Sequence, residues 1–578
     1  MNDYKTTDAN SIVSTVAYNF SEICGIYPIT PASPMAENID ILSNQNKLNF
    51  FKNKVKVIEM QSEAGAIALV HGALQAGVLA SSFTASQGLL LMIPTLYKLS
   101  GEMLPAVIHV AARSLSTHAL SILGDHQDIY ATRQTGVCIL ASSSVQQSYH
   151  FANIAHLSAI SSSLPFIHFF DGFRTSHEIN KIKILNDLEI KKLLDVKGLY
   201  TFRNKALNVN KPNTRGTNEN DDIYFQNTEA RNIDYEQVIE ITINYLNKIN
   251  NLANTNYQPF NYYGDKDATT LIVAMGSVCQ TIKETIDYLI TKNKKVGLIE
   301  VHLYRPFSAK HLIKVLPNTI KRIAVLDRTK EFGSIGEPLY LDVVASLKDL
   351  DIKIIGGRYG LSSKNTTPSH IKAIYDYLSQ KNPSSNFTIG IDDDVTKRSI
   401  PYNKNFHIPL PHREILIYGY GSDGMVGTSK DIIKIIGEYT PLFVQSYSQY
   451  DSKKSGSITR SHIRISKNEI LSTYYVDNPE LIVISKDNYL YNYDILDNIK
   501  QNGIVLLNTN LFEQELVKTL PNRVKKQLAD KNITIYIINA TSIATNHGLK
   551  NKISTCLEIC IFKLLNIIKE DYQNFKRT

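Results

Sequence analysis

The sequence contains no tryptophan and only five cysteines among its 578 residues. No two cysteines form a C-x-x-C pair, which excludes a zinc knuckle and a bacterial-type ferredoxin site. Cys556 and Cys560 lie four residues apart on a helix predicted over 554–568, but no histidine or third cysteine is near them in sequence. We interpret them as packed, reduced thiols. An odd number of cysteines in a chain so poor in them fits a reducing compartment.

Long apolar runs and a strong charge of one sign are also missing. The longest apolar stretches, 89–93 and 559–568, are short or interrupted by Lys563, well below a membrane span. The first residues lack the pattern of a secretory signal or a transit peptide. The 62 basic and 54 acidic residues leave a net charge of only +8, spread along the chain, which argues against nucleic-acid binding. We therefore expect a cytoplasmic protein with no nucleic-acid and no membrane partner.

Short apolar runs alternate with helical stretches through the first 180 residues. Strands are predicted at 23–29, 55–60, 81–84, 106–111, 137–141 and 165–170, and helices at 35–42, 64–79 (capped by Ser62), 89–99 and 145–160. This alternation is typical of a doubly wound parallel sheet, in which ligands bind beyond the carboxyl ends of the strands. Thr30, Glu63, Ser86 and Arg113 all lie just past predicted strand ends. They are the first indication of a site.

Two further alternating segments follow. Strands are predicted at 270–274, 296–301, 322–326 and 352–356, and then at 414–418, 481–484, 503–507 and 534–538. The polar stretches 203–234 and 381–407 separate the segments and are predicted to be long loops or linkers. With 43% hydrophobic and 20% charged residues, the chain has enough apolar material for several cores. We predict three consecutive α/β domains over 1–234, 235–407 and 408–578, the first a doubly wound parallel sheet.

A glycine-rich turn opens the third segment. Gly419, Gly421 and Gly424 have G-x-G-x-x-G spacing between a predicted strand and a helix that begins near residue 428. Backbone amides at such a helix start can hold a phosphate, although glycines that only permit close packing are an equal alternative. No acidic residue ends a second strand about twenty residues on, which argues against NAD. Downstream, Lys453 and Lys454 stand in a turn that suits a second phosphate or is merely solvated.

Two charged residues of the first segment are candidates for a functional role. Glu63 is predicted in the first turn of a helix, either as a charge favoured by the helix dipole or as a functional carboxylate facing a crevice. Arg113 leaves a buried strand, where a guanidinium is suited to hold a substrate carboxylate through two hydrogen bonds. The run 125–128, Asp-His-Gln-Asp, could serve acid–base chemistry, but a histidine among carboxylates is more often structural.

Several longer strings are specific enough to indicate a family. They are 27–35, 59–66, 83–88, 124–130, 169–178, 303–307, 326–331, 357–361 and 450–456, and they span almost the whole chain in order. In these strings the sequence resembles the pyruvate:ferredoxin (flavodoxin) oxidoreductases. The resemblance implies a thiamine-type pyrimidine-binding domain at 1–234, a transketolase C-terminal-like domain at 235–407, and a domain with a coenzyme A site at 408–578. It also implies oxidative decarboxylation of pyruvate to acetyl-CoA and carbon dioxide, with electrons passing through 4Fe–4S clusters to ferredoxin or flavodoxin.

The resemblance also assigns roles to individual residues. Glu63 matches the carboxylate that hydrogen-bonds the aminopyrimidine ring of thiamine diphosphate, where it acts as an acid–base partner. Thr30 and Arg113 match residues that contact pyruvate. Arg113 would hold the carboxylate of pyruvate, and the Thr30 hydroxyl would bond the alkoxide that develops on it. The coenzyme A contacts carried over are Gly421, Ser422, Asp423, Gly424, Met425, Val426 and Lys453. This sequence departs from the family at Ala32, commonly a serine, and at Ser554, where relatives have an asparagine that contacts coenzyme A.

The sequence lacks the family's cluster cysteines and its Gly-Asp-Gly motif for Mg²⁺ and diphosphate. We therefore expect the N-terminal part of a split or truncated oxidoreductase. Thiamine diphosphate would then be shared with a complementary C-terminal chain, which would carry Mg²⁺ and the 4Fe–4S clusters, and the assembled enzyme would be a homodimer. The alternative is an inert relic, or a module that binds only coenzyme A or a partner. Another 2-oxoacid oxidoreductase is less favoured, because the strings are those of the pyruvate branch.

Overall fold

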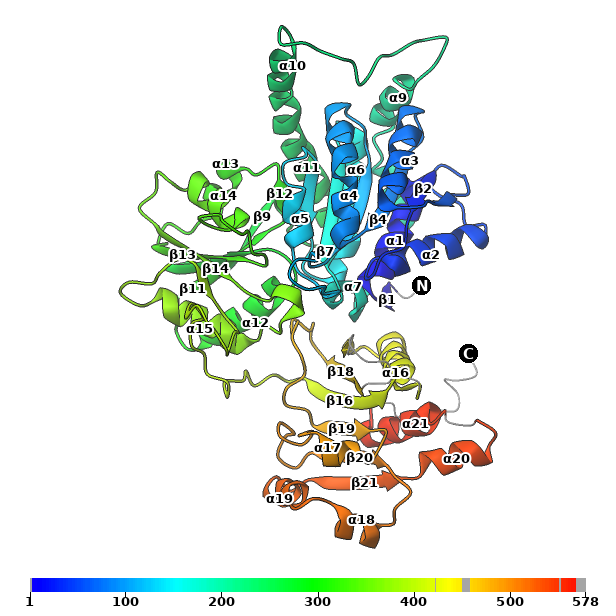
Figure 1. Cartoon of the computed structure of the whole chain (residues 1–578), viewed down its shortest axis with the longest axis vertical. Helices are drawn as coiled ribbons and strands as arrows, with labels where there is room; N and C mark the ends of the chain where they lie inside the picture. The colour runs from blue at the N-terminus through cyan, green and yellow to red at the C-terminus, as the bar shows by residue number, and fades with distance from the viewer. Residues whose placement is uncertain (1–2, 422, 450–457, 550–551, 568–578) are drawn as a thin grey trace. The chain divides into compact units, whose positions relative to one another are not determined.

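The computed structural model describes residues 3–421, 423–449, 458–549 and 552–567. The chain forms two compact units, a larger one of Asp8–Ser176 with Leu185–Ile408 and a smaller one of Met1–Thr7, His177–Ile184 and Pro409–Thr578. Among the described residues the larger unit holds two sheets and the smaller unit holds one (Figure 1). Parallel pairing dominates the two larger-unit sheets, and helices connect their strands, so the predicted α/β class is confirmed.

The first sheet has seven strands in the order β12-β6-β7-β5-β4-β2-β3. They are β2 (Ile23–Ile26), β3 (Lys56–Glu59), β4 (Ala80–Thr84), β5 (Val107–Ala112), β6 (Cys138–Ala141), β7 (Phe166–Asp171) and β12 (Leu303–Arg305). All pair in parallel except β12, which is antiparallel to β6. The strand predicted at 23–29 ends at Ile26, because Pro28 and Pro31 cannot donate to the ladder.

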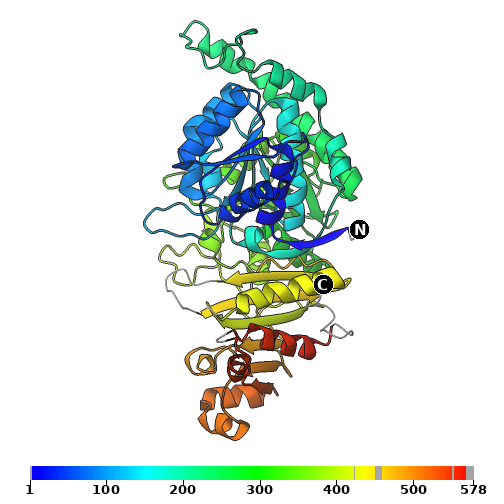
Figure 2. The same ribbon diagram turned by 90° about the vertical axis from the view of Figure 1, so that its right-hand side faces the viewer.

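Helices pack on both sides of this sheet (Figure 2). α3 (Glu63–Gln75) and α4 (Ser86–Gly101) pack together, and α1 (Ala9–Phe20), α6 (Val145–Ser162) and α11 (Asn232–Ala253) form another group. Shorter or more peripheral helices are α2 (Ser33–Asn44), α5 (Gln127–Ala131), α7 (Arg174–His177), α8 (Asp187–Lys192) and α9 (Val196–Asn204). As predicted, the Ser62 hydroxyl caps α3 by accepting from the Gly65 N–H at 3.2 Å.

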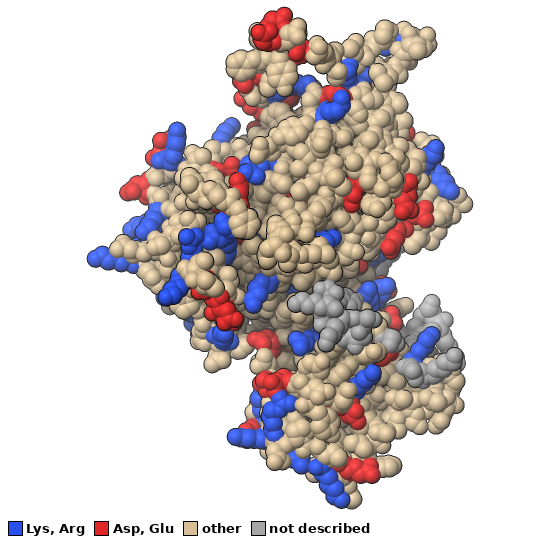
Figure 3. Space-filling view, in the orientation of Figure 1, with Lys and Arg blue, Asp and Glu red and all other residues tan. Residues whose placement is uncertain are grey.

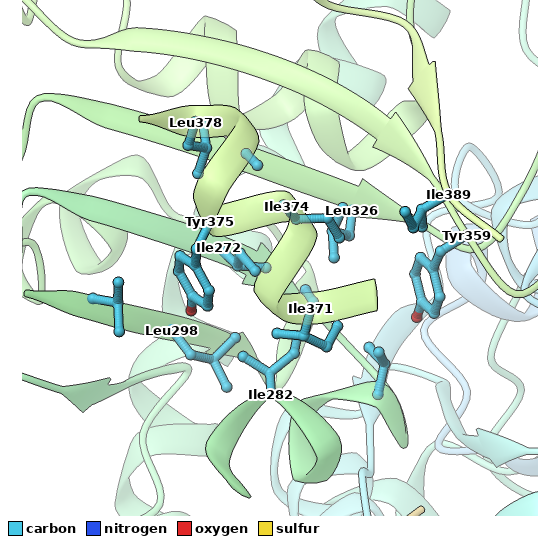
Figure 4. Close-up of a cluster of buried hydrophobic side chains, with 14 of the residues drawn as sticks. Ile272, Ile282, Leu298, Leu326, Tyr359, Ile371, Ile374, Tyr375, Leu378 and Ile389 are labelled. Carbon is cyan, nitrogen blue, oxygen red and sulfur yellow. The ribbon is translucent and has the colours of Figure 1, made fainter. Parts of the chain in front are cut away.

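The second sheet has the order β15-β14-β13-β10-β11-β9. Its strands are β9 (Phe260–Gly264), β10 (Thr270–Ala274), β11 (Val296–Val301), β13 (Arg322–Asp327), β14 (Lys353–Arg358) and β15 (Phe387–Thr388), and only β9 is antiparallel. α15 (Pro368–Leu378) lies across the strands beside α12 (Val278–Thr291), with Ile371, Ile374 and Tyr375 buried against the sheet (Figure 4). α13 (Ala309–Lys314) and α14 (Pro338–Ser346) pack against each other.

The third sheet is mixed, with the order β1-β8-β17-β18-β16-β19-β20-β21. Its strands are β1 (Tyr4–Thr7), β8 (Ile179–Lys183), β16 (Arg413–Tyr420), β17 (Phe443–Gln449), β18 (Ile458–Ser466), β19 (Leu481–Ile484), β20 (Ile504–Asn508) and β21 (Thr534–Ile538). Only β16, β19, β20 and β21 are parallel. Its helices are α16 (Met425–Tyr439), α17 (Tyr489–Asn492), α18 (Glu513–Thr519), α19 (Asn522–Asp530), α20 (Ala540–Asn546) and α21 (Ser554–Leu565).

Strands from distant parts of the sequence join two of the sheets. β1 and β8, from the segment predicted as the first domain, pair with each other, and β8 pairs with β17 of the third sheet. β12, from the second predicted segment, completes the edge of the first sheet. The three predicted segments therefore each supply a sheet, but the sheets exchange edge strands.

The prediction of a long loop at 203–234 is wrong for its second half. That stretch contains α10 (Tyr224–Ala230) and the first residues of α11. α10 has no buried residue, so it lacks the apolar periodicity by which a helix is found in sequence. The other polar stretch, 381–407, contains only the two-residue strand β15.

The surface agrees with the modest net charge. Basic and acidic side chains are interspersed on the face seen in Figure 3, without a large patch of one sign. Within the described ranges, no helix is both long and apolar enough to cross a bilayer.

Three histidines form a buried chain in the larger unit. His109 Nδ1 lies 3.0 Å from His168 Nδ1, and His109 Nε2 lies 3.1 Å from His156 Nε2. The Ser142 hydroxyl meets His168 Nε2 at 2.8 Å. Burial lowers the pKa of all three imidazoles, that of His109 to about 3. Each is therefore neutral in the folded chain at pH values where an unfolded histidine already binds a proton.

This chain of histidines predicts an acid-labile core. The folded pKa of His109 lies below the unfolded value of about 6.5, so its contribution to stability is present above pH 6.5 and is lost as pH falls towards 3. We expect wild type to lose about 1.4 kcal/mol per pH unit below pH 6 relative to His109→Gln. Urea denaturation between pH 7 and pH 4.5 measures this, with exposed His118→Gln as the control. Parallel pH profiles for wild type and His109→Gln would contradict the prediction.

Candidate active site at the carboxyl edge of the first sheet

Three residues singled out in the sequence meet at one edge of the first sheet. Thr30 follows β2, Glu63 begins α3 after β3, and Arg113 directly follows β5. These strands are parallel, so their carboxyl ends share an edge, which is where open α/β sheets bind ligands. All three residues belong to the larger unit.

Arg113 is held by two backbone carbonyls. Its Nη1 donates to the Thr30 carbonyl at 2.8 Å and its Nε to the Ser121 carbonyl at 3.3 Å. The side chain is only 7% exposed, and Nη2 donates to no residue that the structure describes. Burial lowers the pKa of Arg113, while the nearby Asp128 raises it. The guanidinium is thus fixed in place with one terminal nitrogen left for a ligand.

Asp128 links the end of β5 to the start of α4. Its Oδ2 accepts from the backbone N–H of Ser86 at 2.7 Å and of Arg113 at 3.0 Å, and its Oδ1 accepts from the Ile129 N–H at 2.8 Å. Burial raises its pKa to about 8, although these three donors act in the opposite direction. The sequence analysis considered Asp128 only for acid–base chemistry in the run 125–128, and it missed this linking role because Ser86 and Arg113 are distant in the chain.

Asp128→Asn tests this link. The amide keeps the size of the side chain, but its NH₂ group cannot accept a hydrogen bond as the oxygen in that place does, so at least one buried N–H loses its partner. We expect a loss of about 1–3 kcal/mol in the free energy of unfolding. Chemical denaturation measures it, with the exposed Asp349→Asn as the control. Equal stability of wild type and Asp128→Asn would show that the link does not hold this edge together.

The Glu63 side chain is largely buried, and no described residue bonds its carboxylate. It is 6% exposed, and it makes no hydrogen bond or ion pair with any described residue. A Cβ on Gly88 would lie 2.6 Å from both Glu63 Oε1 and Thr84 Oγ1, so only glycine leaves room for the carboxylate here. Thr84 Oγ1 is itself buried without a partner in the described part of the chain. An acid and a hydroxyl are therefore both available to a ligand.

His126 is a buried member of a group of ion pairs centred on Asp171. Its Nε2 pairs with Asp171 Oδ1 at 2.5 Å, and Asp171 Oδ2 pairs with Arg328 Nη1 at 2.9 Å and accepts from the Ser277 N–H at 2.8 Å. Burial raises the pKa of Asp171, but Arg328 and then His126 outweigh it and hold the pKa well below its usual range. The group joins the first and second sheets, in agreement with the structural interpretation of this histidine.

The glycine-rich turn of the third sheet is described apart from Ser422, and Lys453 also lies outside the described residues. Gly424 precedes α16 with φ +83°, and no atom of the described residues lies within 4 Å of a Cβ placed on Gly421. The Asp423 carboxylate closes the turn, accepting from the Tyr420 N–H at 2.6 Å and the Met425 N–H at 3.0 Å. The Met425 side chain is buried in the core and Val426 is half-buried, so Met425 has only its backbone to offer a ligand.

Ser554 lies against this turn. A Cβ on Gly424 would come within 3.0 Å of Ser554 Cβ and Oγ. The residue is far from the turn in sequence, yet the structure brings the two together at the start of α21 and α16.

The cysteines do not gather. Cys24, Cys138 and Cys279 are buried, Cys556 and Cys560 are half-buried, and all five are free thiols. Burial raises the pKa of Cys24 to about 12, so it stays protonated. Among the described residues, no group of three or more histidine, cysteine or acidic side chains is placed to hold a metal ion.

Comparison with known proteins points to one family along the chain. Residues 15–247 match "Pyruvate flavodoxin/ferredoxin oxidoreductase, thiamine diP-bdg". Residues 268–371 match "Pyruvate:ferredoxin oxidoreductase core domain II", and residues 414–577 match "Pyruvate ferredoxin/flavodoxin oxidoreductase". The first match contains Thr30, Glu63 and Arg113, and the last contains the glycine-rich turn.

Individual relatives match over nearly the whole chain. A pyruvate-flavodoxin oxidoreductase of Enterobacter agglomerans is 48% identical over 98% of this chain and 48% of its own length. A pyruvate:ferredoxin oxidoreductase of Moorella thermoacetica is 48% identical over 98% of this chain and 49% of its own length. A pyruvate-flavodoxin oxidoreductase of Klebsiella pneumoniae is 48% identical over 98% of this chain and 48% of its own length. The chain thus spans about half the length of the curated relatives it matches.

Proposed function

The chain belongs to the pyruvate:ferredoxin (flavodoxin) oxidoreductase family, and we propose that it acts in the oxidative decarboxylation of pyruvate to acetyl-CoA and carbon dioxide, with ferredoxin or flavodoxin as electron acceptor. In this proposal the edge of the first sheet is half of the active centre. The observation that carries it is that one edge of the sheet holds both Arg113, a guanidinium fixed by backbone carbonyls with Nη2 still available, and Glu63, a carboxylate that no described residue bonds.

Arg113 and Thr30 are suited to bind a 2-oxoacid. Arg113 Nη2 and the remaining hydrogen of Nη1 can hold the substrate carboxylate through two parallel hydrogen bonds. Thr30 is exposed, and its hydroxyl is bonded to no described residue, so it can donate to the 2-oxo oxygen as negative charge develops there. The hydrogen bond from Arg113 to the Thr30 carbonyl keeps the two groups together.

The residues around Glu63 fit the pyrimidine ring of thiamine diphosphate. The carboxylate and the Thr84 hydroxyl, neither bonded by a described residue, both lie close to Gly88, where a side chain would displace them. When bound, thiamine diphosphate supplies the carbon nucleophile and the electron sink for loss of carbon dioxide. Glu63 would hold and return a proton at Oε1 or Oε2 opposite a ring nitrogen.

In the third sheet, Gly421, Ser422, Asp423, Gly424, Met425, Val426 and Lys453 are proposed to contact coenzyme A, the acetyl acceptor. The space that the described residues leave beside Gly421 and the left-handed Gly424 support a close ligand approach. Asp423 would act by shaping the turn, since its carboxylate already accepts from two backbone amides.

Iron–sulfur clusters and the Mg²⁺–diphosphate site are proposed to come from a part equivalent to the half of the relatives that this chain does not match, in an assembly that is a homodimer. The five dispersed cysteines support this division. An inert module that binds coenzyme A or a partner is the second candidate. It is disfavoured because such a module has no chemical need for Thr30, Glu63 and Arg113 in this arrangement.

We expect the purified chain to be colourless, free of iron and unable to reduce a viologen dye with pyruvate, even with thiamine diphosphate, Mg²⁺ and coenzyme A. Addition of the unmatched half of the Moorella relative as a separate chain should restore dye reduction. Stoichiometric iron, or turnover by the chain alone, would refute the proposed division. If the relative's own matched half restored activity with that partner and this chain did not, the inert module would be favoured.

A further inference from the structure

The chain between β5 and α5 turns back on itself directly after Arg113. The Ser114 N–H donates to the Leu123 carbonyl at 3.1 Å, and the Ser114 hydroxyl donates to the same carbonyl at 2.8 Å. Residues 121–125 form the returning limb of this loop, and the Ser121 carbonyl on it accepts from Arg113 Nε at 3.3 Å. The position of the guanidinium therefore depends on where the returning limb lies.

The returning limb is bonded to a turn of the second sheet. This turn, η1 (Leu361–Ser363), follows β14. The Ser363 N–H donates to the Gly124 carbonyl at 2.8 Å, and the Gly124 N–H donates to Ser363 Oγ, also at 2.8 Å. The Ser362 N–H donates to Asp125 Oδ2 at 3.2 Å. The second sheet thus holds a loop that belongs to the first.

Ser121 lies directly between Arg113 and η1. Its carbonyl accepts from the guanidinium, and its hydroxyl is hydrogen-bonded to the hydroxyl of Ser362. The same Ser121 hydroxyl accepts from the Leu123 N–H at 3.2 Å, which fixes its orientation within the limb. A displacement of Ser362 would therefore reach Arg113 through a single intervening residue.

The backbone of η1 is strained. Ser362 and Ser363 have φ values of 51° and 55°, in the left-handed region, and Gly360 before them has φ 62°. Residues other than glycine rarely adopt this conformation, and they keep it only where the surrounding bonds hold them there. Glycine would form the same turn more easily. What serine adds at these two positions is the pair of hydroxyls that bond Ser121 and Gly124.

The start of η1 is anchored to the group of ion pairs around Asp171. The Gly360 carbonyl accepts from Arg328 Nε at 2.9 Å, and Arg328 Nη1 pairs with Asp171 Oδ2. The Arg328 carbonyl in turn accepts from the His126 N–H at 2.9 Å. These residues are buried, so η1 presents its two serines from a fixed base.

We propose that Ser362 and Ser363 are positioning residues for Arg113. Through the returning limb they hold the guanidinium of the first sheet where it can bind the carboxylate of a 2-oxoacid. The effect on the substrate rests on the proposed function. The mechanical connection between η1 and the limb does not, so the two parts are tested separately.

Hydrogen exchange of the purified full chain tests the connection. Ser363→Gly permits the left-handed backbone but removes the oxygen that accepts from the Gly124 N–H. We expect amides of the limb, residues 121–125, to exchange about tenfold faster, the effect of one lost hydrogen bond. Ser163→Gly is the matched control, since Ser163 is also left-handed, with φ 59°, but ends α6. Wild-type exchange of the limb in Ser363→Gly would overturn the connection and the positioning role with it.

Kinetics of the assembled enzyme test the positioning role. For Ser362→Gly/Ser363→Gly we expect about a tenfold rise in the KM for pyruvate, because a displaced guanidinium binds the carboxylate less well. The value of kcat should change little, since Glu63 is untouched. The urea midpoint should also change little, because glycine relieves the strain while the lost hydrogen bonds act in the opposite direction.

A double-mutant cycle identifies the route through Ser121. In the background of Ser121→Ala, Ser362→Gly should raise the KM much less than it does in wild type, because both changes remove the same bond. Equal effects in both backgrounds, or a wild-type KM in the double glycine variant while Arg113→Lys raises it, would overturn the positioning role alone. A wild-type KM in Arg113→Lys would overturn the positioning role together with the proposed function.

Discussion

Glu63→Gln, in the assembled enzyme that contains this chain, is expected to lower kcat for pyruvate by about 10²–10⁴-fold, the range for loss of an acid–base group. The amide fits the same space beside Gly88 and Thr84 but cannot hold and return a proton. The KM for pyruvate should change little, because the substrate contacts assigned to Arg113 and Thr30 are intact. Steady-state dye reduction measures both constants.

The matched control for this substitution is Glu513→Gln. Glu513 also stands in the first turn of a helix, α18, and it is exposed, so its loss removes only a favourable interaction with the helix dipole. We expect wild-type kcat for Glu513→Gln. If Glu63→Gln also kept the wild-type kcat, Glu63 would be only a charge at a helix N-terminus, like Glu513, and the thiamine assignment would be refuted.

Arg113→Lys is expected to act mainly on substrate binding, with a strong rise in the KM for pyruvate and a fall of about tenfold to a hundredfold in kcat/KM. Lysine keeps the charge but loses the planar fork, and it cannot donate to the Thr30 carbonyl and hold a carboxylate with two parallel bonds. A charge-assisted hydrogen bond of about 1.5–3 kcal/mol gives this range.

Arg133→Lys serves as the control, because Arg133 forms a half-buried ion pair with Glu331 at 3.2 Å and lies outside the proposed site. Kinetics at several pyruvate concentrations separate the two constants. The contrast between the two site variants is informative in itself, since one should change kcat and the other KM. A fall in stability alone for both, with unchanged kinetics, would mean that this edge of the sheet is not a catalytic centre.

Much of the candidate site followed from local patterns. Thr30, Glu63 and Arg113 were found because each lies just past an apolar run, and parallel strands bring such positions to a common edge. The Ser62 cap and the glycine-rich turn were readable for the same reason, since the groups that form them are within four residues of each other. Burial along a strand or around a cap is local information, and the sequence carries it directly.

Other features depend on partners that are distant in the chain. The role of Asp128 follows from its bonds to Ser86 and Arg113, and the room for Glu63 follows from Gly88 on another helix. α10 was missed because no side chain on it is buried. In each case the deciding contact is made by folding and leaves no periodic pattern in the sequence.

The sequence by itself determined the α/β class, the main parallel strands of each sheet and the three residues of the first sheet's edge, because hydrophobic alternation and strand ends are local properties. Only the tertiary structure decided that β1 and β8 join the third sheet, that β12 closes the first, and that Ser363 bonds the loop after Arg113. Strand neighbours are chosen by non-local backbone pairing and by the burial of facing side chains, so chain order does not specify them.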